Sequence, residues 1–177
     1  MSAEIVEWLL GMQGIERELG PGQFLFHRGD AVRQMYIVRE GGIRFVRHLE
    51  DGAAIVLQRA QAGSIVAEAS LFSSKYHCDA TAFDPTRLKA ILKDTVIERL
   101  WQGHEFSKAF AAHLAKEVQK ARMRSEIVTL KTVAQRLDAW LAWHDGMLPN
   151  KGNWRSVAME VGVSPEAFYR AIAKRRS

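Results

Sequence analysis

Four side chains that can bind metals or react as nucleophiles lie close together near the middle of the sequence: Glu68, His77, Cys78 and Asp79. Carboxylates, imidazoles and thiolates bind transition metals and haem, and a thiolate is also open to oxidation. Adjacent strand residues point to opposite faces, so His77 and Cys78 cannot easily coordinate the same ion. We expect Cys78 to pack inward and His77 and Asp79 to anchor loops, with metal ligation, haem ligation and a redox-active thiol as alternatives.

A second group of informative residues lies near the end of the sequence. Ala158 permits a close helix crossing, and Gly162 can adopt the positive φ of a tight turn. Ser164 can cap a following helix, and Pro165 suits its first position. This pattern predicts a helix-turn-helix, with an ordinary helical corner as the alternative. The residues outside its apolar stripe, which can face a DNA groove, are Glu166, Ala167, Tyr169, Arg170, Ala173 and Lys174.

The elements that position the first group are predicted to be strands. Between Gly20 and Leu100, short β-prone runs are separated by Gly- or Asp-containing breaks about every ten residues, which is typical of a β-sandwich or barrel. The expected strands are residues 24–26, 35–38, 43–49, 54–57, 81–83, 87–92 and 95–100, with a turn at 50–52. Residues 3–13 fit a short amphipathic helix before them.

After Trp101 the apolar period changes from two to about 3.5 residues, and neither Pro nor Gly occurs from 104 to 145. One seam at this spacing consists of Leu114, Val118, Ala121, Ser125, Val128 and Thr132. Such a seam is typical of helix pairing, so its first five residues are a candidate dimer interface. The alternative is a helix packed on its own β domain. A second helical stretch is expected at 133–144.

Composition excludes several classes of protein. The single cysteine among 177 residues cannot form an intramolecular disulfide, a Cys-only zinc site or a four-cysteine iron–sulfur cluster. No apolar run is long enough to span a membrane, and the acidic start of the chain is unlike a signal peptide, so we expect a cytoplasmic protein. With no His-x-His pair, nucleophile–base pair or phosphate loop, we do not expect an enzyme.

The net charge of +5 is unevenly distributed. Residues 1–115 carry a net charge of −1, whereas residues 116–136 and residues 150–177 each carry +4. A basic end on a nearly neutral body indicates an anionic polymer as partner, although solvated basic faces are also common.

The order of these elements resembles the Crp/Fnr family of transcription regulators, over nearly all of the chain. The resemblance rests on residues 26–30, 35–41 and 63–72 and on the Ser-x-Glu-x-x-x-Arg pattern of residues 164–170. It implies an α+β fold: a jelly-roll-like β-roll sensor domain (a double-stranded β-helix) at 1–103, a central dimerisation helix at 104–132, and a helix-turn-helix DNA-binding domain at 133–177.

The resemblance also implies roles for individual residues. Glu166 would accept a hydrogen bond from a cytosine amino group and Arg170 would bind guanine in the major groove. Pro165 stands where the family often has Arg, so we expect a different operator. The implied DNA-binding residues are Ser164, Pro165, Glu166, Tyr169, Arg170 and Lys174. The implied effector pocket contains Glu68, Ala69, Ser70, Cys78 and Asp79.

Two departures from the family pattern affect these expectations. Cyclic-nucleotide-binding members carry Arg followed by Ser or Thr where this chain has Cys78 and Asp79, so we do not expect cyclic AMP to bind. No other cofactor is identified, and the effector is unknown. Members usually continue into a β-hairpin wing, whereas this sequence ends at Ser177. Either the basic tail substitutes for the wing, or phosphate contacts are fewer and DNA binding is weaker.

The sequence therefore predicts a homodimeric, sequence-specific DNA-binding regulator that is independent of cyclic AMP. The implied partners are a palindromic operator in double-stranded DNA, a second copy of the chain, a small-molecule effector and RNA polymerase, with no membrane. The alternative is a β-roll module that regulates a protein partner, with a vestigial helix-turn-helix.

Overall fold

The computed structural model describes residues 2–48 and 54–176, which form two compact units, Met1–Leu114 and Ala115–Ser177. The boundary lies within the long helix α3 (His104–Thr129), so this helix contributes to both units. The expected turn at 50–52, together with Leu49 and Ser177, lies outside the described residues.

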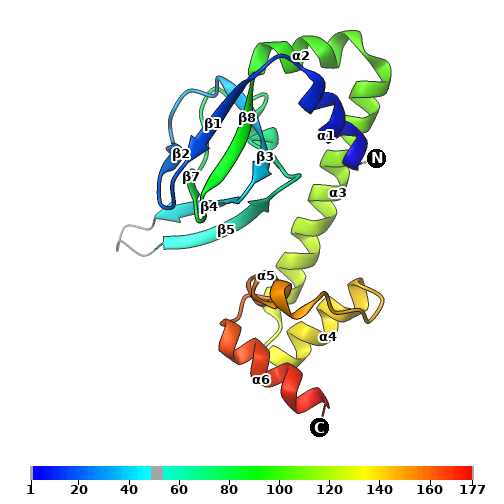
Figure 1. The fold of residues 1–177 in the computed structure, drawn as a ribbon. Coiled ribbons are helices and arrows are strands. Elements are labelled where there is room, and N and C mark those ends of the chain that lie inside the picture. The colour runs from blue at the N-terminus through cyan, green and yellow to red at the C-terminus, as the bar shows by residue number, and fades with distance from the viewer. Residues whose placement is uncertain (1, 49–53, 177) are drawn as a thin grey trace. The chain divides into compact units, whose positions relative to one another are not determined.

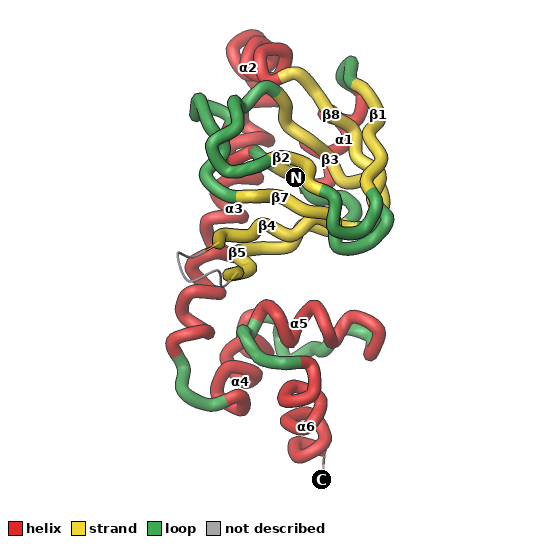
Figure 2. The backbone as a smooth tube through the Cα atoms, turned by 90° about the vertical axis from the view of Figure 1, so that its left-hand side faces the viewer, coloured by secondary structure: helices red, strands yellow, loops and turns green. Residues whose placement is uncertain are grey.

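The first unit contains two four-stranded antiparallel sheets, ordered β1-β8-β3-β6 and β2-β7-β4-β5 (Figures 1 and 2). The strands are β1 (Ile15–Leu19), β2 (Phe24–Phe26), β3 (Gln34–Glu40), β4 (Gly42–His48), β5 (Ala54–Gln61), β6 (Ile65–Val66), β7 (Asp79–Ala82) and β8 (Thr86–Leu92). The expected β-roll is confirmed. Strands β1 and β6 were not expected from the sequence, because β1 is an edge strand rich in charged residues and β6 has only two residues.

One apolar core lies between the two sheets. It includes Phe26, Tyr36, Val38 and Leu88, and alternate residues of β3 and β8 enter it because successive strand side chains point to opposite faces. The connection between β3 and β4 requires Gly41, whose φ is +72° and whose hypothetical Cβ would lie 2.2 Å from the Pro85 carbonyl oxygen. The turn thereby brings the sheets together at that end.

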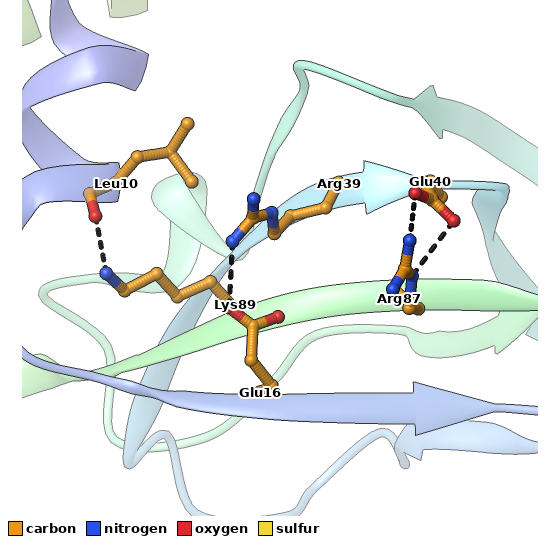
Figure 3. Close-up of polar contacts among 6 residues, drawn as sticks. All are labelled: Leu10, Glu16, Arg39, Glu40, Arg87 and Lys89. Atoms are coloured by element: carbon orange, nitrogen blue, oxygen red, sulfur yellow. Dashed lines mark hydrogen bonds and ion pairs between the residues drawn. The ribbon is translucent and has the colours of Figure 1, made fainter.

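Helices α1 (Ser2–Gly11) and α2 (Lys93–Gln102) and the start of α3 form a second core with the β1-β8-β3-β6 sheet. Its fully buried members include Ile5, Leu9, Met35, Ile37, Ile91 and Phe106. The ammonium group of Lys89 donates a hydrogen bond to the Leu10 carbonyl at the end of α1, and this tie joins helix to sheet (Figure 3).

Two exposed ion pairs cross the same sheet, Glu16 with Arg39 and Glu40 with Arg87 (Figure 3). The Arg87 side chain lowers the pKa of Glu40 through a hydrogen bond. Because exposed pairs of this kind contribute little to stability, the buried helices and strands hold this unit together.

The prediction of a strand at residues 95–100 was wrong, since these residues belong to α2. The β-branched run Thr95-Val96-Ile97 favours a strand locally. As a helix, however, the segment buries Val96 fully and packs Ile97 and Leu100 against the second core. Tertiary burial therefore outweighs the local preference.

Helix α3 ends at Thr129, and α4 (Val133–Trp143) follows after a short break that contains neither Pro nor Gly. The break is set by a capping box: the Gln135 backbone N–H donates to the Thr132 hydroxyl, and the Thr132 N–H donates to the Gln135 side chain. Thr132 is therefore the N-cap of α4 and does not belong to the predicted seam of α3.

The second unit packs α4, α5 (Trp154–Glu160) and α6 (Pro165–Arg176) with the end of α3. A short 3-10 turn, η2 (Lys151–Asn153), precedes α5. The buried core consists of Ile127, Leu137, Trp140, Leu141, Trp154, Val157, Ala158, Val161, Phe168 and Ile172. Within residues 2–48 and 54–176, none of the helices is long and apolar enough to cross a bilayer.

Candidate functional site

A small pocket opens in the first unit beside the 3-10 turn η1 (Glu68–Ser70), with a volume of about 70 Å³. Its lining residues are Phe26, Phe45, Leu57, Gln58, Ala67, Glu68, Ala69, Ser70, His77 and Cys78. Glu68 is the one charged side chain in this set, which contains no Arg or Lys. This volume is less than half that of an apolar cavity of about 150 Å³, which holds a single benzene molecule.

The backbone at this pocket is strained. Ala67, which precedes η1, has a φ of +74°, a left-handed conformation that costs an L-residue roughly 1–2 kcal/mol. The side chain of Ser70 is buried, and its Oγ lies 3.3 Å from His77 Nδ1, which connects η1 to the segment before β7. Strained residues held by their surroundings are concentrated at ligand sites, which supports a functional role for the pocket.

Cys78 lies buried at the pocket wall, as expected. Burial raises the pKa of its thiol, the nearby carboxylates of Asp79 and Glu68 raise it further, and Arg47 opposes them. A raised pKa lowers the thiolate population, which is the reactive form. The arrangement therefore disfavours the alternative of a redox-active thiol.

Asp79 is the one predicted pocket residue that does not line the pocket. Its carboxylate accepts a hydrogen bond from the Arg28 backbone N–H at 2.9 Å and lies 3.0 Å from His48 Nδ1 and 3.6 Å from His27 Nδ1. Cys78 and Asp79 diverge because successive residues here point to opposite sides. As expected, Asp79 anchors loops. In the described part of the chain, no three His, Cys, Asp or Glu side chains are placed to hold a metal ion.

Sequence reasoning missed six pocket residues: Phe26, Phe45, Leu57, Gln58, Ala67 and His77. Phe26 and Ala67 lie in the segments that carried the resemblance, and His77 is among the candidate ligands considered above. Phe45 and Gln58 face each other across β4 and β5, so only the strand register shows that they belong to the pocket.

In the second unit, α5 and α6 are joined by a tight turn. Gly162 has a φ of +67°; its N–H donates to the Met159 carbonyl, and the Val163 N–H donates to the Ala158 carbonyl. These two bonds are the Schellman arrangement that ends many helices at a glycine. The Ser164 hydroxyl then accepts from the Ala167 N–H at 3.2 Å, so the expected glycine turn and serine cap are confirmed.

Three charged residues predicted to bind DNA, Glu166, Arg170 and Lys174, are exposed on α6. They are four residues apart and therefore share one face of the helix. The pKa of Glu166 is lowered because its own backbone N–H and the Ser164 hydroxyl donate to the carboxylate, with Arg155 and Arg170 adding to the effect. Glu166 is therefore an anion set among cations at the start of α6.

Two of the other residues predicted to bind DNA, Pro165 and Tyr169, are less accessible. Tyr169 packs against the core, with its ring centroid 5.4 Å from that of Trp154, so it lies partly within the apolar stripe rather than outside it. Pro165 is half-buried at the first position of α6, whereas Ser164 is exposed. Arg175 forms an exposed ion pair with Asp138 of α4.

The predicted seam on α3 is mostly exposed in the single chain. Val118 and Val128 remain 48% and 40% exposed, and Ala121 and Ser125 are also exposed. Leu114 is half-buried and packs against the second core of the first unit. Four of the five residues are therefore accessible to a partner chain, whereas Leu114 already packs within the first unit.

Residues 16–102 match the family model described as "Cyclic nucleotide-binding domain". No curated protein sequence matches the chain. Among solved structures, the chain resembles FixK2 from Bradyrhizobium japonicum, with a TM-score of 0.72, 17% identity, and coverage of 92% of this chain and 84% of that one.

It also resembles the c-di-GMP-responsive global regulator CLP of Xanthomonas campestris, with a TM-score of 0.64, 18% identity and coverage of 98% and 91%. A third similar structure is TTHB099, a CRP-family transcriptional regulator from Thermus thermophilus, with a TM-score of 0.61, 18% identity and coverage of 90% and 84%. Residues 16–102 are therefore similar to a cyclic nucleotide-binding domain, and the chain shares its fold with FixK2, the global regulator CLP and the CRP-family regulator TTHB099.

Proposed function

We propose that the chain is a transcription regulator that binds DNA in a sequence-specific manner through α6. The observation that carries this proposal is the α5–α6 pair, whose Schellman turn and serine cap leave Glu166, Arg170 and Lys174 on one exposed face. In helix-turn-helix proteins, the second helix of such a pair lies in the major groove.

Each of the three side chains has a distinct role in this proposal. Arg170 donates two hydrogen bonds to guanine O6 and N7, and the ionised Glu166 accepts one from a cytosine amino group. Lys174, one turn further on, binds a phosphate and adds affinity without sequence preference. Arg155, which lies close enough to lower the pKa of Glu166, adds positive charge at the same end of α6.

The proposed regulator acts as a homodimer through α3. Val118 and Val128 are large apolar side chains that remain exposed, with the small residues Ala121 and Ser125 between them at a coiled-coil spacing. Small residues allow two helices to approach closely. A symmetric dimer presents two α6 helices and therefore reads a palindromic site.

The proposed regulator does not depend on cyclic AMP. A cyclic phosphate needs a cation, and the pocket lining contains Glu68 and no Arg or Lys. Calorimetry with cyclic AMP and cyclic di-GMP is expected to show no binding at micromolar concentrations. Micromolar binding of either nucleotide, lost on changing a pocket residue, would refute this part of the proposal.

Selection of bound sites from a random DNA library, with dissociation constants measured at several salt concentrations, tests DNA reading. We expect one palindromic site to be enriched. Arg170→Ala should weaken binding to that site about 5- to 150-fold, which corresponds to about 1–3 kcal/mol, and relax specificity at one position. Lys174→Ala is the matched control, and it should weaken all sites alike and reduce the salt slope by about 1. No enriched site, or an Arg170→Ala variant that binds normally, would contradict the proposal.

A further inference from the structure

We propose that Arg136 is a positioning residue that locks the turn before α6 to the end of α3, and that DNA affinity depends on this lock. The functional part of the inference rests on the DNA binding proposed above. Arg136 lies in the first turn of α4 and is half-buried. It contacts no residue of the exposed α6 face through any hydrogen bond described for it, so its effect on DNA is indirect.

The guanidinium group of Arg136 donates to four backbone carbonyls from two parts of the chain. Nη2 donates to Val128 in the last turn of α3 at 3.0 Å, and Nε donates to Leu130, just after that helix, at 2.8 Å. Nη1 donates to Gly162 at 2.9 Å and to Val161 at 3.3 Å, both in the turn that follows α5. All three nitrogens of one side chain are thus used to join these two segments.

These carbonyls are natural targets for a cation. The last carbonyls of a helix have no partner within the helix, and the helix dipole places partial negative charge there. Arg136 serves the C-terminal ends of α3 and α5 at once, because its planar fork directs five N–H groups in fixed directions. A lysine carries the same charge but has no such fork, so it could not make the same set of bonds.

The backbone around Arg136 is closely packed. A Cβ at Gly162 would lie 3.1 Å from Val128 Cγ1 and 3.3 Å from Arg136 Nη1, so the turn approaches α3 more closely than a side chain would easily allow. The capping box of Thr132 and Gln135 fixes the start of α4, from which Arg136 extends. Ser164, two residues beyond Gly162, caps α6. The position of the turn therefore sets the position of α6 within this unit.

Arg136→Lys tests this assignment, with Arg33→Lys as the matched exchange at an exposed arginine of the first unit. We expect Arg136→Lys to weaken binding to the selected DNA site at least tenfold with an unchanged salt slope, and to speed hydrogen exchange at the Gly162 and Val163 amides. Arg33→Lys should change neither quantity appreciably. Near-UV circular dichroism confirms that the Trp154 environment is retained in both variants.

The competing assignment is a direct phosphate contact. In that case Arg136→Lys would retain affinity, and Arg136→Gln would reduce the salt slope by about 0.9 while exchange at the turn stayed normal. Either result overturns the inference. The wild-type chain supplies a test that needs no folded variant: the Arg136 Nε proton should exchange far more slowly than that of the exposed Arg33, and equal rates would refute the lock. If the wild-type chain binds no DNA, the proposed function fails, while the exchange measurements still decide the role of Arg136.

Discussion

Replacing Phe168 with Ala should strongly destabilise the second unit and leave the stability of the first unchanged. Phe168 has no exposed surface, and it lies at the centre of the core formed by α3, α4, α5 and α6, with its ring edge-on to Trp154 at 6.2 Å. Truncating a fully buried Phe to Ala costs about 3–5 kcal/mol, because transfer energy is lost and a cavity is left. A unit of this length has a total stability of about 3–9 kcal/mol, so the loss is a large part of it.

Urea unfolding followed by tryptophan emission and far-UV circular dichroism measures the effect. Trp140, Trp143 and Trp154 report on the second unit, whereas Trp8 and Trp101 report on the first. We expect two transitions in Phe168→Ala, with only the one assigned to the second unit moved to low urea. The control is Phe72→Ala, since Phe72 is 69% exposed and its removal should change stability by less than about 0.5 kcal/mol.

The reasoning would be refuted by a destabilisation below about 1 kcal/mol in Phe168→Ala, because no fully buried aromatic side chain is that dispensable in a well-packed core. A single transition that shifts as a whole would refute the separation of the two units. Equal effects of Phe168→Ala and Phe72→Ala would show that burial does not decide the cost.

Two further predictions concern the β-roll. Because burial raises the pKa of Cys78, its reaction with an aromatic disulfide at pH 7 should be far slower in the folded protein than in urea, and equal rates would contradict an inert thiol. Burial raises the pKa of Asp79, but the Arg28 N–H, His48 and His27 together lower it below its usual value. A lowered folded-state pKa stabilises the protein above the ordinary pKa of about 3.9, and this stability is lost as the pH falls through the folded-state pKa. Asp79→Asn should therefore be less stable than wild type at pH 7 but comparable in strong acid, and a deficit that is independent of pH would disprove the contribution of the charge.

Local chemistry made some features predictable. The β-prone runs of the roll are separated by Gly- or Asp-containing breaks. Gly162 and Ser164 act through their own backbone neighbours, so a single stretch of sequence is enough to identify the turn between α5 and α6. The burial of Cys78 was predictable as well, because a free cysteine behaves as a small apolar side chain.

Features that depend on distant partners were not predictable. Thr95, Val96 and Ile97 favour a strand by local preference, and they form a helix because α2 buries Val96 against a core assembled from other segments. By helical spacing Tyr169 lies outside the apolar stripe, but its ring packs against that of Trp154, fifteen residues earlier. The Arg136 bonds join carbonyls 8 and 26 residues away and leave no local pattern in the sequence.

The three apolar cores described above have no residue in common. A substitution that alters the pocket wall therefore acts on the core between the sheets, whereas one that alters the support of α6 acts on the core of the second unit. Mutations distant from one another and without shared partners combine nearly additively. Substitutions during evolution can therefore change the pocket and the surface of α6 separately. Related chains should diverge in these two features independently of each other.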